Sequence, residues 1–396
     1  MGVKEKIQQK ASEIKSKLIE IRHHIHSNPE LSFQEFETQK FIENYLQNTL
    51  GLKTQRIANT GVVALIEGKN PSKRVVGLRA DMDALPITEV NDGRPYRSKV
   101  EGVMHACGHD VHATSLLGAA TILNGLKDEF EGTVKLIFQP GEEKLPGGAS
   151  IMIKEGVLEN PKVDFMIGQH VMPFVQVGKI GFRQGLYMAS ADEIFVTVKG
   201  KGGHGAMPHL GIDPIAIASQ MIVALQQVVS RSANPIIPSV LTFGKFIANG
   251  STNVIPNEVH IEGTFRTLNE EWRAEAHQKM IATAKGVVEG LGGTVDFEVR
   301  KGYPFLKNDV ELTQKCESFA KNYMGENNIE ALDIWMAAED FSYYSQEVPS
   351  CFYRLGTRNE VKGTTFGVHH PNFDIDEDAL ENGAGLLAYL AIENLQ

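Results

Sequence analysis

A chain of 396 residues is longer than a single hydrophobic core usually supports, so it predicts two domains. With 42% hydrophobic and 22% charged residues, the composition is that of a folded globular protein and excludes a largely disordered chain. A formal net charge of −10 argues against nucleic acid or an anionic membrane as the main partner.

The compartment is indicated by the N-terminus and by the cysteines. No stretch approaches the roughly 18 consecutive apolar residues that a membrane span needs, and Met1–Glu20 lacks the apolar region of a signal peptide. Three cysteines, at positions 107, 316 and 351, cannot all pair and lack the spacing of a disulfide framework. The simplest prediction is the reducing cytoplasm, where a functional thiol at Cys107 stays available.

In the N-terminal part of the chain, apolar periodicity predicts a helix that ends at Asn28-Pro29 and a second helix over Glu35–Leu50. Short apolar strands follow, with a buried helix expected over His112–Lys127. The strands are Val62–Glu67, Val75–Arg79, Val134–Phe138 and Phe165–Gly168. Because strands alternate with helices, we expect an α/β sheet that is covered on both faces.

The pattern changes near Met188 to the order β-α-β-β-α-β of a ferredoxin-like domain. Its expected elements are Glu193–Lys199, Asp213–Ser230, Val240–Ile247, Val259–Thr267, Glu270–Glu289 and Thr294–Arg300. The first pattern then resumes with a helix over Lys307–Met324, strands over Cys351–Leu355 and Thr364–Val368, and a helix from Asp376. We therefore predict a catalytic α/β domain made of residues 1–187 and 305–396, interrupted by an α+β domain at residues 188–304.

Four of the expected strands run directly into side chains that can bind a metal ion. These side chains are Asp81 and Asp83, Glu142 and Glu143, His170, and His369. In open α/β sheets, ligands gather at the carboxyl ends of the strands, so we expect these groups to converge.

The densest group of potential ligands is the segment from His105 to His112, which contains Cys107 and His109. A thiolate and an imidazole two residues apart suit zinc and its first-row neighbours. A closed structural zinc site would need four Cys or His ligands at regular local spacing, so the scattered carboxylates favour an open catalytic site. We predict that Cys107 and His109 are ligands, and that His105 and His112 support ligands or fill the core.

Adjacent carboxylates at Glu142 and Glu143 can divide the labour of a metal site. One can bind metal while the other takes a proton from a water whose pKa the metal lowers to about 7. A solvated acidic turn is the alternative, and the position after Pro140-Gly141 at a strand end disfavours it. The local sequence does not tell which glutamate is the base.

The charge balance allows two divalent ions, and a site with a single ion is the alternative. Two ions carry about four positive charges, of which the thiolate, one glutamate and a hydroxide would neutralise three. Asp81 and Asp83 could supply the remainder directly, or could orient a histidine ligand.

Segments spread over nearly the whole chain carry a resemblance to a known family. They are His26-x-x-Pro29-Glu30-Leu31, Arg79–Pro86, His105–Asp110, Gln139–Glu143, Gly203–His209, Asn253–Pro256, Glu339–Phe341 and His369-x-Pro371-x-Phe373. The chain resembles the M20 metallopeptidases, in the branch of N-acyl-amino-acid amidohydrolases that includes hippurate hydrolases and auxin-conjugate hydrolases. The resemblance implies a three-layer αβα zinc-peptidase-like catalytic domain with an inserted ferredoxin-like lid, through which the protein forms a homodimer or a higher homo-oligomer.

The resemblance also implies a site with two divalent metal ions, which are zinc, manganese, cobalt or nickel. The implied metal ligands are Cys107, His109, Glu143, His170 and His369. Glu142 is then the general base, and Asp81 and Asp83 support the ligands. At the last motif, His370 stands where a small polar residue is usual, and the register with Pro371 favours His369 as the ligand.

Three residues of the inserted domain are implied to contact the substrate. His204 corresponds to a lid histidine that stabilises the oxyanion, often in the partner subunit, and Asn253 and Arg266 correspond to substrate-binding positions. From the residues alone, the favoured interpretation of His204 is a solvated loop histidine. Asn253 is equally a turn residue, and Arg266 is equally a member of an ion pair.

The expected reaction is hydrolysis of the amide bond of N-acyl amino acids to a carboxylate and a free amino acid. A dipeptidase or aminopeptidase of the same fold is the first alternative, and it would need a group that binds the free α-amine. A non-catalytic metal-binding or ligand-binding protein is the second. The pair Glu142-Glu143 argues against it, because such a protein need not keep a free base beside its ligand.

Overall fold

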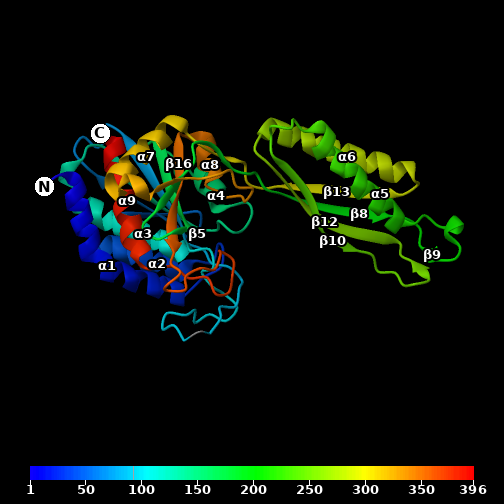
Figure 1. The fold of residues 1–396 in the computed structure, drawn as a ribbon, viewed down its shortest axis with the longest axis horizontal. Coiled ribbons are helices and arrows are strands. Elements are labelled where there is room, and N and C mark those ends of the chain that lie inside the picture. The colour runs from blue at the N-terminus through cyan, green and yellow to red at the C-terminus, as the bar shows by residue number, and fades with distance from the viewer. Residues whose placement is uncertain (92) are drawn as a thin grey trace. The chain divides into compact units, whose positions relative to one another are not determined.

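The structure is a computed structural model that describes residues 1–91 and 93–396. These residues form two compact units (Figure 1). The first consists of Met1–Tyr187, Lys307–Ile334 and Asp340–Gln396, and the second of Met188–Leu306 with Trp335–Glu339. Each unit has its own hydrophobic core. Among the described residues, the helices are too short or too polar to cross a membrane.

The first unit is built on an eight-stranded sheet with the order β1-β2-β4-β3-β5-β16-β6-β15. Its centre is parallel, because β3 pairs with β4 and β5, and β5 pairs with β16. These four strands span Val75–Asp81 (β3), Thr133–Gln139 (β4), Phe165–Gln176 (β5) and Ser350–Arg358 (β16). The outer strands are Thr54–Ile57 (β1), Gly61–Glu67 (β2), Ile180–Phe182 (β6) and Ile329–Ala331 (β15). Both faces of β3 and β4 are buried, which fits their largely apolar sequences.

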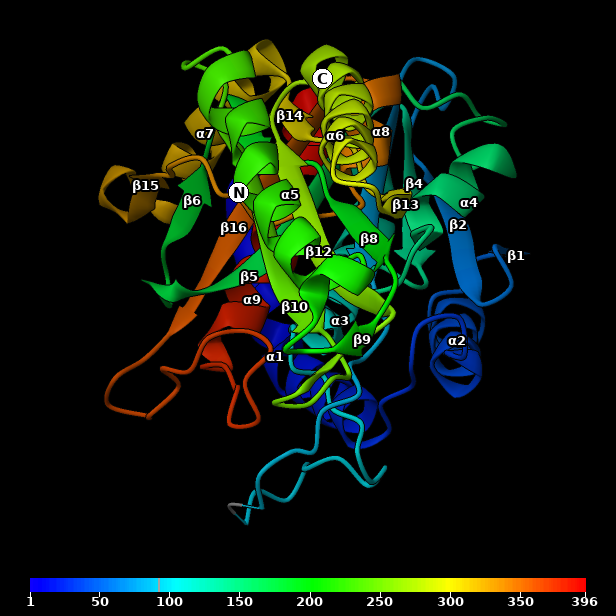
Figure 2. The same ribbon diagram turned by 90° about the vertical axis from the view of Figure 1, so that its right-hand side faces the viewer.

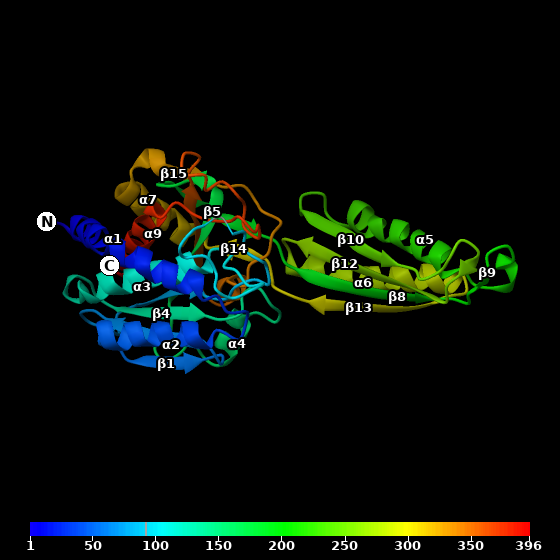
Figure 3. The same ribbon diagram turned by 90° about the horizontal axis from the view of Figure 1, so that it is seen from below.

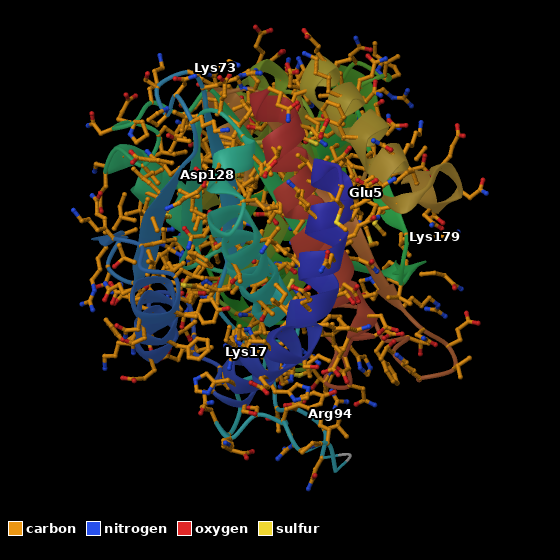
Figure 4. The ribbon with its side chains drawn as sticks, turned by 90° about the vertical axis from the view of Figure 1, so that its left-hand side faces the viewer. Glu5, Lys17, Lys73, Arg94, Asp128 and Lys179 are labelled. Carbon is orange, nitrogen blue, oxygen red and sulfur yellow. The ribbon has the colours of Figure 1, made fainter. Side chains whose placement is uncertain are left out.

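One face of this sheet is covered by helices α1 (Val3–Ser27), α3 (His109–Asn124) and α9 (Asp378–Leu395), which lie side by side (Figure 4). They share an apolar core with alternate residues of β3, namely Val76, Leu78 and Ala80. The same face holds α2 (Phe36–Asn44) and α7 (Val310–Met324).

The intervening residues of β3, Arg79 and Asp81, point to the opposite face because side chains alternate along a strand. Arg79 donates to Asp340 at 2.7 Å, just before α8 (Ser342–Glu347). Ala149 N, in α4 (Gly148–Lys154), donates to the same carboxylate at 3.0 Å. Helices therefore cover both faces, which confirms the predicted three-layer α/β class.

The second unit is an antiparallel sheet with the order β10-β12-β8-β13. Its strands span Asp192–Lys199 (β8), Ser239–Ile247 (β10), Glu258–Thr267 (β12) and Thr294–Lys301 (β13). Helices α5 (Pro214–Gln227) and α6 (Glu270–Gly290) lie together on one face (Figures 2 and 3). Each helix begins at a capping side chain, Asp213 for α5 and Asn269 for α6. The order along the chain is the β-α-β-β-α-β of a ferredoxin-like domain.

The strand expected at Thr364–Val368 is wrong. Within the described residues Thr364 forms a single β-bridge, with Asn359, so this segment folds back on the end of β16 instead of joining the sheet. Gly363, at φ +77°, makes the turn. Several boundaries also differ from the prediction; for example, α3 begins at His109 rather than at His112, and β5 continues past Gly168 to Gln176.

Candidate metal centre

The start of α3 and the strand β5 bring three predicted ligands together. Cys107 and His109 flank Gly108, and His170 lies in β5. Gly108 has φ +83°, and a Cβ at this position would lie 2.5 Å from Val171 Cγ2, so the tight turn before α3 requires glycine. Cys107 Sγ is 3.5 Å from His170 Nε2. One ligand atom from each of the three residues lies within 4.8 Å of the other two.

The turn after β4 adds the two glutamates, and a loop adds His369. Glu143 Oε1 is 3.2 Å from His369 Nε2. His369 has φ +63° and donates its backbone N–H to Ala106 O at 2.7 Å, which fixes the loop beside Cys107. Ligand atoms of Cys107, Glu143 and His369 form a second group within 4.8 Å of one another, so Cys107 belongs to both groups. The structure thus brings the five predicted ligands together, whereas metal binding itself stays a prediction.

Asp83 holds several parts of the site at once. One carboxylate oxygen accepts from His109 Nδ1 at 3.2 Å and from Glu142 N at 3.0 Å. The other accepts from Glu143 N at 3.0 Å and from Ser32 Oγ at 2.6 Å. Burial alone would raise the pKa of Asp83, but the hydrogen bond from His109 and the other donors hold it below its usual value. Asp83 is therefore an ionised anchor for both the histidine and the glutamate turn.

The contact with Asp83 leaves the other ring nitrogen of His109 available. His109 Nε2 is buried and has no hydrogen-bond partner in the part of the chain that the structure describes. It lies 3.8 Å from Asp81 Oδ2 and 4.0 Å from Glu142 Oε2. A buried imidazole nitrogen without a partner is costly unless something occupies the space in front of it. The predicted orienting role of Asp83 gives this nitrogen the geometry of a metal ligand.

Asp81 hydrogen-bonds to a second histidine, His112, and also lies beside His109. Its carboxylate bonds to His112 Nδ1 at 2.5 Å and to Arg79 Nη1 at 2.6 Å. His112 Nε2 accepts from Val171 N at 2.9 Å, next to His170. The pKa of Asp81 lies well below its usual value because the charges of Arg79 and of nearby imidazoles outweigh burial. His112 thus supports the backbone beside His170, a predicted ligand. Of the two roles that the sequence left open for His112, supporting a ligand or filling the core, this contact favours the first.

The donor set fits transition-metal ions. Burial, together with the charges of Glu143 and Glu142, raises the pKa of the Cys107 thiol well above its usual value. A cation at this point reverses the balance and favours the thiolate. Thiolate, imidazole and carboxylate are the ligands of zinc and its neighbours, and the shared position of Cys107 accommodates a pair of ions.

Two other histidines of these motifs have different surroundings. His105 is buried, its ring nitrogens have no hydrogen-bond partner among residues 1–91 and 93–396, and burial lowers its pKa to about 4. His370 stacks on Phe366 with ring centroids 4.5 Å apart, and its Nδ1 accepts from Asn372 N at 3.1 Å. It belongs to none of the ligand groups found in the described residues, whereas His369 does.

The remaining predicted residues lie in the second unit. His204 is in β9 (Gly203–His204), which pairs with β11 (Val254–Ile255) directly after Asn253. His204 and Asn253 are exposed, and Gly205 N donates to Asn253 O at 2.8 Å. Arg266 lies in β12 and is half-buried, and its Nη1 is a buried atom without a hydrogen-bond partner in the described residues.

Sequence reasoning missed Glu35 and Ser32. Both are buried, and both reach the glutamate turn from the loop between α1 and α2: Ser32 through Asp83, and Glu35 through Gly141 N, which donates to it at 2.9 Å. One feature of the sequence could have pointed to them. They follow the segment His26–Leu31, which resembles the family but had no role assigned to it.

Comparison with known proteins assigns the chain to a family. A model of peptidase family M20/M25/M40 matches residues 77–393. The N-acyl-L-amino acid amidohydrolase of Geobacillus stearothermophilus is 45% identical over 307 residues, which are 77% of this chain and 82% of that protein. The crystal structure of a putative aminohydrolase from methicillin-resistant Staphylococcus aureus has a TM-score of 0.90 at 36% identity and covers 99% of this chain and 100% of its own. That of a Bacillus subtilis protein, described as a dinuclear metal-binding peptidase of the M20 family, has a TM-score of 0.81 at 35% identity and covers 97% and 99%. The chain belongs to the M20/M25/M40 family of peptidases.

Proposed function

We propose that the protein is a metal-dependent amidohydrolase that cleaves the amide bond of N-acyl amino acids and releases a carboxylate and a free amino acid. The observation that carries the proposal is the position of Cys107 in two ligand groups, one with His109 and His170 and the other with Glu143 and His369. The named activity of the Geobacillus relative supports the substrate class.

The proposed cofactor is a pair of divalent ions, which are zinc, manganese, cobalt or nickel, held by these five residues. When bound, such ions polarise the substrate carbonyl and lower the pKa of water at the site. The described metal content of the Bacillus subtilis relative supports two ions rather than one.

Glu142 is the proposed general base. Its side chain is buried, and its backbone N–H is fixed by Asp83, so the carboxylate is held beside the ligand groups rather than in solvent. It accepts the proton of the attacking water and passes the proton to the nitrogen of the departing amine. Glu143, the adjacent residue, contacts His369 and acts as a ligand.

The second unit contributes the proposed substrate contacts. His204 Nδ1 accepts from Ala206 N at 3.1 Å, so the ring proton is on Nε2, which can donate to the oxyanion. Asn253 and Arg266 are proposed to bind the amino-acid half of the substrate, and the buried Nη1 of Arg266 is suited to a carboxylate. All three cysteines are free and buried, which suits a reducing compartment, and we propose the cytoplasm.

A substrate panel tests the function. The metal-reconstituted protein is incubated with N-acetyl, N-benzoyl and longer N-acyl amino acids, and with dipeptides of the same amino acids that have a free amine. We expect equimolar carboxylate and amino acid from the acylated substrates, measured by chromatography, and loss of the activity after chelation. Faster cleavage of the free-amine peptides would favour the dipeptidase alternative. Absence of turnover with zinc, manganese, cobalt and nickel would favour the non-catalytic binding protein.

We also propose that the protein is a homodimer formed through the edge strand β10. Among the described residues β10 pairs with β12 alone, so its other edge can pair with a second chain. Apolar side chains are exposed along this edge and on the neighbouring helix α5. Phe246 is 40% and Val223 is 67% exposed. Exposed apolar groups beside an open edge are typical of a subunit interface.

Replacement of Phe246 by glutamate is expected to convert the dimer into a monomer, because the charge would be buried at the interface. Light scattering coupled to size-exclusion chromatography measures the mass. Ile281→Glu is the matched control, since Ile281 is 42% exposed on α6, away from the edge strand. A wild-type chain that is monomeric at micromolar concentration contradicts the proposal.

A further inference from the structure

The loop between α1 and α2 lies against two segments of the first unit, the one that carries Asp83 and the turn that carries Glu142 and Glu143. Leu31 forms a β-bridge with Ala84, and Ala84 N donates to Glu30 O at 2.8 Å, so the loop runs beside the end of β3. Ser32 Oγ donates to Asp83 at 2.6 Å. The loop therefore touches the carboxylate that orients His109.

Glu35 extends from this loop to the glutamate turn. Its side chain is fully buried, at 0% exposed. One carboxylate oxygen accepts from Gly141 N at 2.9 Å and from Phe33 N at 2.9 Å, and the other accepts from Thr60 Oγ1 at 2.6 Å. Asp83 accepts from the next two amides of the turn, so two buried carboxylates bind three consecutive N–H groups.

The backbone near Glu35 is strained where the loop meets the turn at Gly141. Phe33 has φ +65°, an uncommon conformation for a bulky residue. Its ring packs on Gly141, where a Cβ would lie 2.4 Å from Phe33 Cζ. Such strain persists when the surrounding structure over-determines it, and it concentrates at functional sites. Here it brings the ring and the carboxylate of the same loop onto one residue of the turn.

Burying the carboxylates of Glu35 and Asp83 near each other lowers the stability of the folded state. Burial, followed by the charge of Asp83, raises the pKa of Glu35 to about 7. A buried group held near a like charge is disfavoured by desolvation and by repulsion. An apolar side chain at this position would avoid that cost but would leave Gly141 N–H without its acceptor, so the carboxylate acts through this hydrogen bond.

We propose that Glu35 is a positioning residue for the reaction: by holding Gly141 N it sets the direction in which Glu142 and Glu143 leave the turn. The side chain of Glu35 is fully buried and bonds to two backbone amides and to Thr60, so it acts through the turn. This inference rests on the proposed function for its kinetic part, and on the ligand groups alone for its metal-binding part.

The test compares Glu35→Ala with Thr60→Val, the matched control. The control removes the hydrogen bond to the far oxygen of Glu35 and leaves the bond to Gly141 N in place. Glu35→Gln is the rescue variant, because its amide oxygen can accept from Gly141 N and its amide NH₂ can donate to Thr60 Oγ1. Each variant is titrated with cobalt(II), followed by the thiolate-to-cobalt absorption band, and is assayed with an N-acyl amino acid.

Removal of a group that orients ligands typically costs 10–100-fold in metal affinity or activity. We expect losses of about this size in cobalt affinity and in kcat for Glu35→Ala, with KM little changed. Glu35→Gln should recover most of both losses. Thr60→Val should lower the melting temperature with near-wild-type cobalt affinity and kcat. If Glu35→Ala does not fold, Glu35→Asp takes its place, because its shorter side chain loses Gly141 N.

Two outcomes would overturn the proposal. One is a Glu35→Ala protein with wild-type cobalt affinity and kcat. The other is a Thr60→Val protein that loses as much affinity and kcat as Glu35→Ala, which would assign Glu35 to loop stability. Failure of the proposed function is distinguishable: a wild-type chain that hydrolyses no N-acyl amino acid would refute that function, while the cobalt titration would still test the position of the turn.

Discussion

Replacement of Glu142 by glutamine is expected to lower kcat by about two to four orders of magnitude while the metal content stays unchanged. The amide has the same size as the carboxylate but cannot accept the proton of the attacking water. Its oxygen can keep the 3.4 Å contact from Asp340 N, and the backbone bond to Asp83 does not depend on the side chain. The turn should therefore keep its shape, and the loss should fall on proton transfer.

Metal analysis by mass spectrometry and steady-state kinetics measure the two quantities. Glu143→Gln is the matched control, because Glu143 contacts His369 and is the proposed ligand of the pair. We expect this variant to lose metal as well as activity. A Glu142→Gln enzyme with its full metal content and near-wild-type kcat would show that Glu142 is not the base.

The second large effect is expected from Cys107→Ser. Serine keeps the size of the residue but stays neutral, so both ligand groups lose their shared anionic donor. Loss of a group that merely orients a ligand already costs 10–100-fold, so loss of this shared ligand should weaken metal binding by at least about 100-fold. Because binding displaces a proton from the thiol, the affinity of the wild-type protein should rise with pH.

Competition titration with a chromophoric chelator measures the affinity. Cys316→Ala is the control, since Cys316 is a buried cysteine of α7 that belongs to none of the ligand groups in the described residues. It should keep its metal affinity whatever it costs in stability. Equal affinities for Cys107→Ser and the wild-type protein would remove Cys107 from the site.

Much of the catalytic unit follows from local sequence pattern. The strands β3 and β4 are mostly apolar, and acidic residues lie at or just beyond their carboxyl ends. The rule that ligands gather at strand ends therefore predicted that Asp83 and the glutamate turn converge, and Glu142 N donates to Asp83 in the structure. The ferredoxin-like order of the second unit followed from the alternation of strand and helix periods.

The rest depends on contacts between residues far apart in the sequence. The prediction at Thr364–Val368 assumed that His369 follows a strand. In the structure His369 instead lies in a loop, has a positive φ, and reaches Cys107 from there. Glu35 binds the amide of Gly141, more than a hundred residues away, and no local period reports such a contact. The short helices α4 and α8 were missed for a similar reason, because seven and six residues are too few to show a helical period.

The most direct test of the account is anomalous diffraction from crystals of the zinc-loaded protein. The account predicts two anomalous peaks in the first unit, one bounded by Cys107, His109 and His170, and the other by Cys107, Glu143 and His369. Peaks elsewhere, or no peak beside Cys107 in crystals that contain stoichiometric zinc, would contradict the central claim that this cluster is the metal centre.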